Sequence, residues 1–398
     1  MPSTKVSNRS GIRIHTFTRY EAQNYADLSY LFCNITGGDP LPNTVDSTGT
    51  PVTEKFTGSR YMTFDPGFQK MRIDVELAGE QDSDTIVTVQ DFLEHALADC
   101  VAAGFDSYMA VFSSHGGGFA GYGGDENKGR RGLLQTNQNI VQAISSALAN
   151  TPGAPAKLDV IGFDACLMQA VGAADDYKGV TNYILASEAV EPGHGWAYNV
   201  LPSDSASSNA LEFSKQILRF FISETQGGNS HRAPKTLAIL NTDKFATFIE
   251  AFESLSADLL DNIATDVSLH TFVSRARAAS VAFEGIVDVV GAQWPSGLDI
   301  GSFLENFQSL CNPTGTLGTD LQTALNAYND MFEEVGIGEG TAAGSGMHIT
   351  WPAQSEFDAE EPLWDQVLFQ NPFYSTDIIP NFKVRRAKLE CSYFTAYA

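Results

Sequence analysis

The chain is poor in cysteine, and its cysteines are not grouped in the sequence. Only five of the 398 residues are cysteine, an odd number, and they are widely spaced. No CxxC pair occurs among Cys33, Cys100, Cys166, Cys311 and Cys391. This spacing excludes a zinc ribbon, a thioredoxin-type motif and a disulfide framework. The question that remains is whether one of these thiols has a chemical role.

Long apolar runs are also missing. The run at 158–163 is far shorter than the roughly 20 apolar residues of a bilayer-spanning helix. Residues 1–13 are polar and lack the apolar stretch of a signal peptide. We therefore expect a soluble protein with no signal peptide or transmembrane segment in this chain. The sequence does not assign a compartment.

Basic residues are scarce as well. The chain has 24 Lys and Arg against 48 Asp and Glu, a formal net charge of −24. Such a field repels phosphate backbones and anionic lipid, so binding to nucleic acid or to a membrane surface is not expected. Hydrophobic residues make up 43% and aromatic residues 11%, which is enough for a large folded core.

Short β-rich runs alternate with helical patterns in the first half of the chain, which predicts an α/β layered fold with right-handed crossovers. The run at 157–163 is apolar almost throughout, as in a strand buried on both faces of a parallel sheet. Strands are predicted at 12–20, 60–64, 107–114, 157–163, 182–187 and 236–241, and helices at 21–32, 87–103, 137–150, 167–176 and 210–224.

The pattern changes in the second half. Residues 243–335 are almost entirely helical in pattern, and 346–351 is typical of a late strand. We divide the chain into a catalytic core at 10–242, a helical subdomain at 243–345, and a last strand and tail at 346–398 that pack on the core.

Two of the predicted strands end in residues that can do chemistry. The strand SYMAVFSS is followed by His115, and the strand KLDVIGF is followed by Asp164, Ala165 and Cys166. Adjacent parallel strands end at the same edge of a sheet, so a histidine and a cysteine there can form a nucleophile–base pair. A helix that begins at 167 would lower the pKa of the thiol through its dipole, with help from a nearby imidazolium.

The glycines after His115 leave backbone N–H groups open to a substrate carbonyl. We assign an oxyanion hole to the backbone N–H groups of Gly116 and Cys166. Taken singly, a cysteine at a strand end is more often inert packing, and a His-Gly pair is more often a plain turn. The two together are more specific, because both follow predicted strands and lie 51 residues apart, near the spacing of caspase-type enzymes.

The stretches SSHGGG, IGFDACLM and ASEAVEPGHGW resemble the clostripain family of cysteine peptidases. The resemblance extends from about residue 12 to at least residue 351, and the caspase signature QAC-x-G is absent. It implies a caspase-like three-layer α/β fold, related to that of gingipains and legumains, with a mostly parallel central sheet flanked by helices and a C-terminal helical region. It also implies that His115 is the general base and Cys166 the nucleophile that forms an acyl-enzyme, with no cofactor required.

A carboxylate beside the nucleophile would bind a cationic side chain at P1, the substrate residue before the cleaved bond. Asp164 lies two residues before Cys166 and, by strand alternation, on the same side. The resemblance implies that this aspartate selects Arg or Lys; alternatively, it caps the following helix. Glu188 either adds negative charge to the pocket or anchors its loop. His194 borders the pocket in this family, and it is also a rival base.

The polar loop at 123–132 holds three basic residues, Lys128, Arg130 and Arg131. Relatives in this family mature by self-cleavage, so we expect cleavage after one of these three; a solvated linker is the alternative. Asp125 and Glu126 in the same loop could hold calcium, on which clostripain depends, but two carboxylates are far below a complete site.

The sequence thus predicts a monomeric, clostripain-like endopeptidase that cleaves peptides and proteins after Arg and less readily after Lys. One alternative is a catalytically silent homologue that acts as a binding or scaffold protein. Another is a transpeptidase or an Asn-specific enzyme like legumain.

Overall fold

The structure is a computed structural model. It describes residues 10–17, 28–34, 44–46, 48–52, 59–65, 70–77, 79, 81–82, 85–123, 136–192, 195–196, 209–223, 235–283, 297–338 and 344–351.

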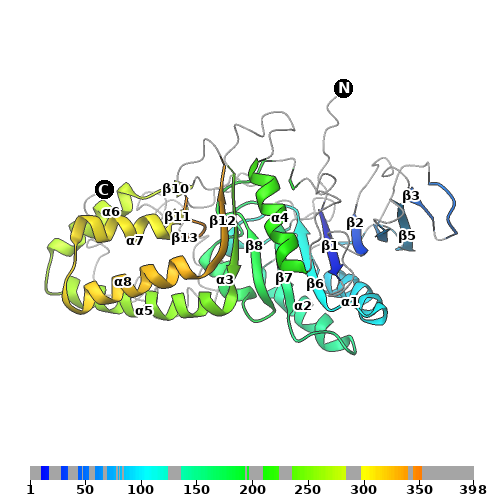
Figure 1. Ribbon diagram of the computed structural model, residues 1–398, viewed down its shortest axis with the longest axis horizontal. Coiled ribbons are helices and arrows are strands. Elements are labelled where there is room, and N and C mark those ends of the chain that lie inside the picture. The colour runs from blue at the N-terminus through cyan, green and yellow to red at the C-terminus, as the bar shows by residue number, and fades with distance from the viewer. Residues whose placement is uncertain are drawn as a thin grey trace, which may run out of the picture.

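Within these residues, ten strands form one sheet, and two of its three parallel ladders lie in its central part, while the third lies at one edge (Figure 1). The ladders β6–β7 and β7–β8 are parallel, whereas β6 and β8 each have an antiparallel partner on their other side. In spatial order the strands are β12 (Phe332–Ile337), β9 (Thr236–Asn241), β8 (Thr181–Ala186), β7 (Leu158–Asp164), β6 (Ser107–Ser113), β1 (Ser10–Phe17), β2 (Leu28–Asn34), β4 (Ser59–Asp65), β5 (Lys70–Glu76) and β3 (Thr44–Val45).

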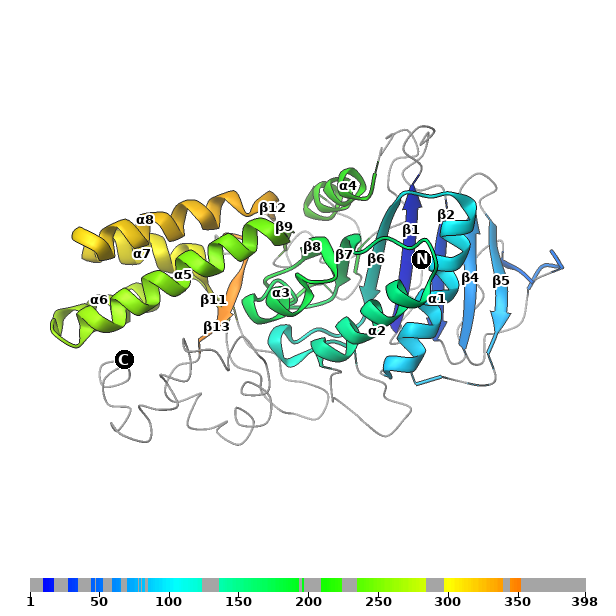
Figure 2. The ribbon, with the colours of Figure 1, turned by 90° about the horizontal axis from the view of Figure 1, so that it is seen from below.

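Helices cover both faces of the central strands. On one face lie α1 (Ile86–Ala103), α2 (Asn137–Asn150) and α3 (Val171–Tyr177), and on the other lies α4 (Ala210–Ser223) (Figure 2). Strand β6 serves both layers because its side chains alternate. Ala110 and Phe112 pack with α1–α3, while Met109 and Val111 pack with α4. The predicted three-layer α/β fold is therefore confirmed.

Periodicity located most elements of the core. Helix α1 has the predicted apolar spacing. Its N-cap residue is Thr85, whose side chain accepts a hydrogen bond from Thr88 N, and its C-cap residue is Gly104, which lies in the left-handed region (φ 81°). The helix expected at 21–32 is wrong where the structure describes it, because 28–34 is strand β2, paired with β1 and β4. Its sequence LSYLFCN holds four large apolar or aromatic residues that suit a strand, and pairing with a strand on each side stabilises the extended conformation.

The C-terminal helices α5 (Thr242–Ile263), α6 (Ser268–Ala279), α7 (Ile300–Cys311) and α8 (Gly315–Asp330) extend beyond one edge of the sheet (Figure 1). Residues 332–335, also expected to be helical, belong to β12, which pairs with β9 at that edge. The Arg219 guanidinium on α4 donates to both carboxylate oxygens of Glu334 on β12, at 2.8 and 2.7 Å. No helix among the described residues has the length and apolar character needed to cross a membrane.

A second sheet joins the helical region to the core. It consists of β10 (Ala282–Phe283), β11 (Gly297–Asp299) and β13 (His348–Thr350), and β13 confirms the predicted late strand. The backbone N–H of His348 donates to Gln169 O at 3.1 Å, which ties β13 to the segment before α3. The His348 ring is buried, and burial lowers its pKa to about 4.

This buried ring predicts a pH-dependent stability. In the unfolded chain a histidine has a pKa of about 6.5, so between pH 6.5 and about 4 the unfolded state takes up a proton that the folded state does not. We expect the folded protein to lose about 3 kcal/mol from this group as the pH falls through that window. The measurement is urea unfolding of wild type and His348→Gln at pH 7 and pH 4.5. The difference in stability between the two proteins should shrink or reverse at the lower pH, and a constant difference would contradict the prediction.

Candidate active site

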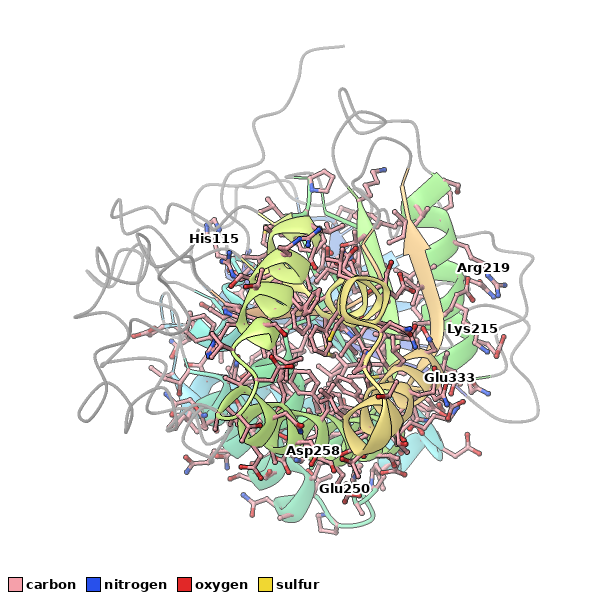
Figure 3. All side chains as sticks on the ribbon, turned by 90° about the vertical axis from the view of Figure 1, so that its left-hand side faces the viewer. His115, Lys215, Arg219, Glu250, Asp258 and Glu333 are labelled. Atoms are coloured by element: carbon pink, nitrogen blue, oxygen red, sulfur yellow. The ribbon has the colours of Figure 1, made fainter. Side chains whose placement is uncertain are left out.

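Strands β6 and β7 end side by side at one edge of the sheet. Ser113, the last residue of β6, pairs in parallel register with Asp164, the last residue of β7. His115 and Cys166 each follow this pair by two residues, so both lie beyond the same edge, as predicted. The His115 side chain is exposed at the periphery of the molecule (Figure 3), and Cys166 is partly exposed.

The segment after His115 touches the segment around Cys166 directly. A Cβ atom built on Gly116 would lie 2.2 Å from the carbonyl oxygen of Cys166 and 2.9 Å from Cγ of Met168. Real Cβ atoms do not approach other atoms so closely. Only glycine therefore permits the two segments to approach so closely. The backbone next to His115 thus lies against Cys166.

Two contacts fix this glycine loop in place. Gly116 pairs with Tyr122 across the loop, and the Tyr122 ring packs edge-on against Phe112, with centroids 5.6 Å apart. The Asn137 side chain at the start of α2 donates from Nδ2 to Gly118 O at 3.0 Å. The loop is thus anchored both to the sheet and to a helix.

Two backbone donors at this edge have no acceptor within the described part of the chain. Within the described residues, neither the N–H of Gly116 nor that of Cys166 donates a hydrogen bond to another residue. These are the two groups that the sequence analysis assigns to an oxyanion hole. A substrate oxygen is the kind of acceptor they lack.

The chain turns sharply after Cys166. Leu167 has φ 61°, in the left-handed region that costs a non-glycine residue about 1 kcal/mol, and its N–H donates to Ala189 O at 3.0 Å. Helix α3 begins only at Val171. The helix predicted from 167 therefore starts four residues later than expected, because residues 167–170 pair with the loop after β8.

The environment of the thiol is the reverse of the predicted one. Burial, and after it the nearby acidic side chain of Glu191, raises the pKa of Cys166 to about 11. The nearby Asp164 carboxylate raises the pKa further, while the N–H of Glu191, which donates to Sγ at 3.3 Å, lowers it. The prediction of a lowered thiol pKa is wrong for this structure, since α3 starts too far away and the groups around the sulfur are apolar and acidic.

Asp164 is buried and enclosed by two segments. Its Oδ1 accepts a hydrogen bond from the N–H of Trp196 at 3.0 Å, and its Oδ2 accepts one from Ser113 Oγ at 3.3 Å. Gly195 has φ 64°, and a Cβ there would lie 2.8 Å from Asp164 Oδ1. Asp164 does not cap the next helix, because the N-cap residue of α3 is Ala170. It is the acidic group against which Gly195 and Trp196 lie.

Comparison with known proteins now identifies the family. The model of the clostripain family matches residues 68–295, which is more than half of the chain. This chain belongs to the clostripain family. It is therefore a cysteine-type peptidase. None of the curated protein sequences matches it.

Solved structures similar to this clostripain-family chain agree on the fold. An inactive zymogen C11 protease from Parabacteroides distasonis is 15% identical with a TM-score of 0.52, over 78% of this chain and 82% of that one. A secreted C11 cysteine protease from Bacteroides thetaiotaomicron, bound to an irreversible peptide inhibitor, is 15% identical with a TM-score of 0.54, over 81% and 86%. At this identity the likeness establishes the caspase-like fold and nothing finer.

Glu188 is held in the interior of this clostripain-family peptidase. Its Oε1 accepts a hydrogen bond from Gly346 N at 3.1 Å, and only 1% of the residue is exposed. Burial, and after it the charge of Asp299, raises the pKa of Glu188 well above its ordinary value, which favours the neutral form. These contacts are those of an anchor between the loop after β8 and the β11–β13 sheet, the second of the two roles considered for Glu188.

Some predicted residues lie outside the described part of the chain. They are the rival base, the three processing residues and the two calcium candidates: His194, Lys128, Arg130, Arg131, Asp125 and Glu126. Within the described ranges, no group of three or more His, Cys, Asp or Glu side chains could hold a metal ion.

The sequence analysis missed Glu191. The residue stands in the quoted stretch ASEAVEPGHGW, but nothing in its local pattern distinguishes it from a solvated loop carboxylate. In the structure its N–H reaches Cys166 Sγ and its side chain reaches Trp196. Only the folding of the loop after β8 over β7 reveals these contacts.

The contact between the Gly116 and Cys166 segments predicts the effect of adding one methyl group at Gly116. In Gly116→Ala the new Cβ must push Cys166 away, so we expect peptidase activity on casein to fall by about 100-fold or more, as a displacement of about 1 Å does. Gly179→Ala is the matched control, because a Cβ there meets nothing within 4 Å. Thermal melting of both variants checks folding. A folded Gly116→Ala protein with activity within twofold of wild type would contradict the prediction.

Proposed function

We propose that this peptidase hydrolyses peptide and protein substrates after Arg, and less readily after Lys, with Cys166 as nucleophile and His115 as general base. The observation that carries the proposal is the buried Asp164, whose carboxylate lies beside the cysteine at the edge of the sheet and is fixed by Trp196 and Ser113. A fixed carboxylate of this kind favours a cationic P1 side chain, and a guanidinium can bind it in a bidentate manner.

In the proposed mechanism the Cys166 thiol transfers its proton to the His115 imidazole while the sulfur attacks the scissile carbonyl carbon. The N–H groups of Gly116 and Cys166 hold the oxyanion that forms. The imidazolium then protonates the leaving amine, and water hydrolyses the acyl-enzyme with His115 again as base. The raised pKa of Cys166 supports this order, since a thiol that is neutral at pH 7 needs a base during the attack.

We further propose that the enzyme cleaves itself after Lys128, Arg130 or Arg131, acts as a monomer, and needs no cofactor. The buried, protonated thiol of the uncut chain fits an inactive precursor. The loop that holds these residues lies between β6 and α2, so a cut there severs the connection directly behind the glycine loop. Activity in excess EDTA tests the alternative that Asp125 and Glu126 bind a required calcium ion.

A first prediction concerns self-cleavage and activity together. Wild type should be cut after Lys128, Arg130 or Arg131 and should then release the fluorophore from Arg and Lys aminomethylcoumarin peptides, because Cys166 supplies the nucleophile for both reactions. Cys166→Ala should remain intact and inactive. Intact mass and fluorescence check this. A wild-type chain that stays intact and inactive, even after trypsin nicks the loop, would establish the silent homologue instead.

A second prediction concerns P1 selection. Asp164→Asn keeps an oxygen that accepts from the Trp196 N–H and places an NH2 group that can donate to Ser113 Oγ, but it removes the charge. We therefore expect kcat/KM for Arg peptides to fall by about 100-fold, which corresponds to about 3 kcal/mol. Asp261→Asn, on the exposed side of α5, is the matched control and should have little effect. Retained activity on Arg peptides, or a preference of wild type for Asn peptides, would favour the legumain-like or transpeptidase alternative.

A further inference from the structure

The backbone of Glu191 contacts the Cys166 thiol, and its side chain lies near the Asp164 carboxylate. Its N–H donates to Cys166 Sγ at 3.3 Å. Its carboxylate oxygen Oε1 accepts a hydrogen bond from the Trp196 indole Nε1 at 3.3 Å. The same Trp196 donates its backbone N–H to Asp164 Oδ1. Trp196 therefore donates hydrogen bonds to the carboxyl groups of both Glu191 and Asp164.

Trp196 is itself a rigid support. It is 4% exposed and belongs to the apolar cluster between the sheet and α4. A Cβ on Gly162 of β7 would lie 3.1 Å from the Trp196 ring, so the indole rests directly on the strand that ends in Asp164. The relative positions of the two carboxyl groups are thus set by packing and not by a mobile loop tip.

The second oxygen of Glu191, Oε2, is buried and accepts no hydrogen bond from the described residues. Burial, and after it the charge of Asp164, raises the pKa of Glu191 well above its ordinary value. The Glu191 carboxyl group lies in hydrogen-bond contact with Asp164, and this contact raises the pKa of Glu191 further, as expected when a protonated carboxyl donates to a neighbouring carboxylate. The titratable groups that face Glu191 from the described elements are Asp164 on β7 and Cys166 in the turn after it, and both disfavour a second negative charge.

We propose that Glu191 is the second carboxyl group of the pocket and loses its proton to solvent when a cationic P1 side chain binds. The inference rests on the proposed cleavage after basic residues. In the free enzyme Glu191 is neutral beside ionised Asp164. An entering guanidinium supplies the positive charge that lets both carboxyls ionise, and its N–H donors take the place of the proton that Glu191 shares with Asp164. Two carboxylates match the several N–H donors of Arg better than the compact ammonium of Lys, so Glu191 determines the preference for Arg.

The first test is the isosteric variant Glu191→Gln, which keeps an acceptor for Trp196 Nε1 but cannot ionise. In the cleaved enzyme we expect kcat/KM for an Arg peptide to fall by about tenfold, mostly through KM, while a Lys peptide loses less, so that the Arg/Lys ratio falls. The matched control is Glu250→Gln, which removes one charge from exposed α5, well away from His115 in Figure 3. An unchanged Arg/Lys ratio in Glu191→Gln would overturn the inference.

The second test measures the proton and needs no variant to fold. Calorimetry of benzamidine binding to cleaved wild type, in two pH 7 buffers of different ionisation enthalpy, should report release of about one proton, and benzamidine affinity should rise with pH. Release should be absent in Glu191→Gln. Wild type that cleaves Arg peptides but releases no proton, or release that persists in Glu191→Gln, means that Glu191 lacks this role while the proposed function stands. A cleaved wild type that does not hydrolyse Arg or Lys peptides refutes both.

Discussion

The active-site edge depends on one close contact between two backbones. Where Gly116 lies against the carbonyl of Cys166, there is no room for a Cβ atom. This contact joins the loop after β6 to the turn after β7, and it also leaves the N–H groups of both residues without partners in the described structure. The strained conformation of Leu167 belongs to the same arrangement, because its N–H must reach the loop after β8. Backbone geometry therefore holds this edge together, with support from the side chains of Tyr122 and Asn137.

A second set of hydrogen bonds, made by the loop after β8, supports this edge. The loop after β8 is tied to the Leu167 turn through its carbonyl groups and to the β11–β13 sheet through Glu188 and Gly346. Asp299 continues this connection, since its two oxygens accept hydrogen bonds from the hydroxyl and the N–H of Ser345. Buried polar groups thus connect the helical region to the active-site edge. Strand β12 of this region is also the last strand of the core sheet. These interactions give the C-terminal half a structural role at the site.

Electrostatics distinguish this site from a simple thiolate–imidazolium pair. The thiol lies near Asp164 and Glu191, so negative charge is disfavoured both on the sulfur and on the second carboxyl group. Under the proposed cleavage after basic residues, a positive side chain of the substrate supplies the counter-charge. On that proposal, recognition of the substrate and preparation of the catalytic groups involve the same small set of residues, which the fold holds through Trp196.

The sequence by itself determined the elements whose apolar period is strong, such as α1, α2, β6 and β7, and it placed His115 and Cys166 after two neighbouring strands. The local pattern is sufficient there, because burial requires an apolar residue at every second position of a strand or at every third to fourth position of a helix. Tertiary structure decided the rest: that 28–34 is a strand, that α3 starts at Val171, that Glu188 is an anchor, and that Glu191 reaches the thiol. Each of these depends on pairing or burial between segments distant in the chain, and such contacts leave no period in the local sequence.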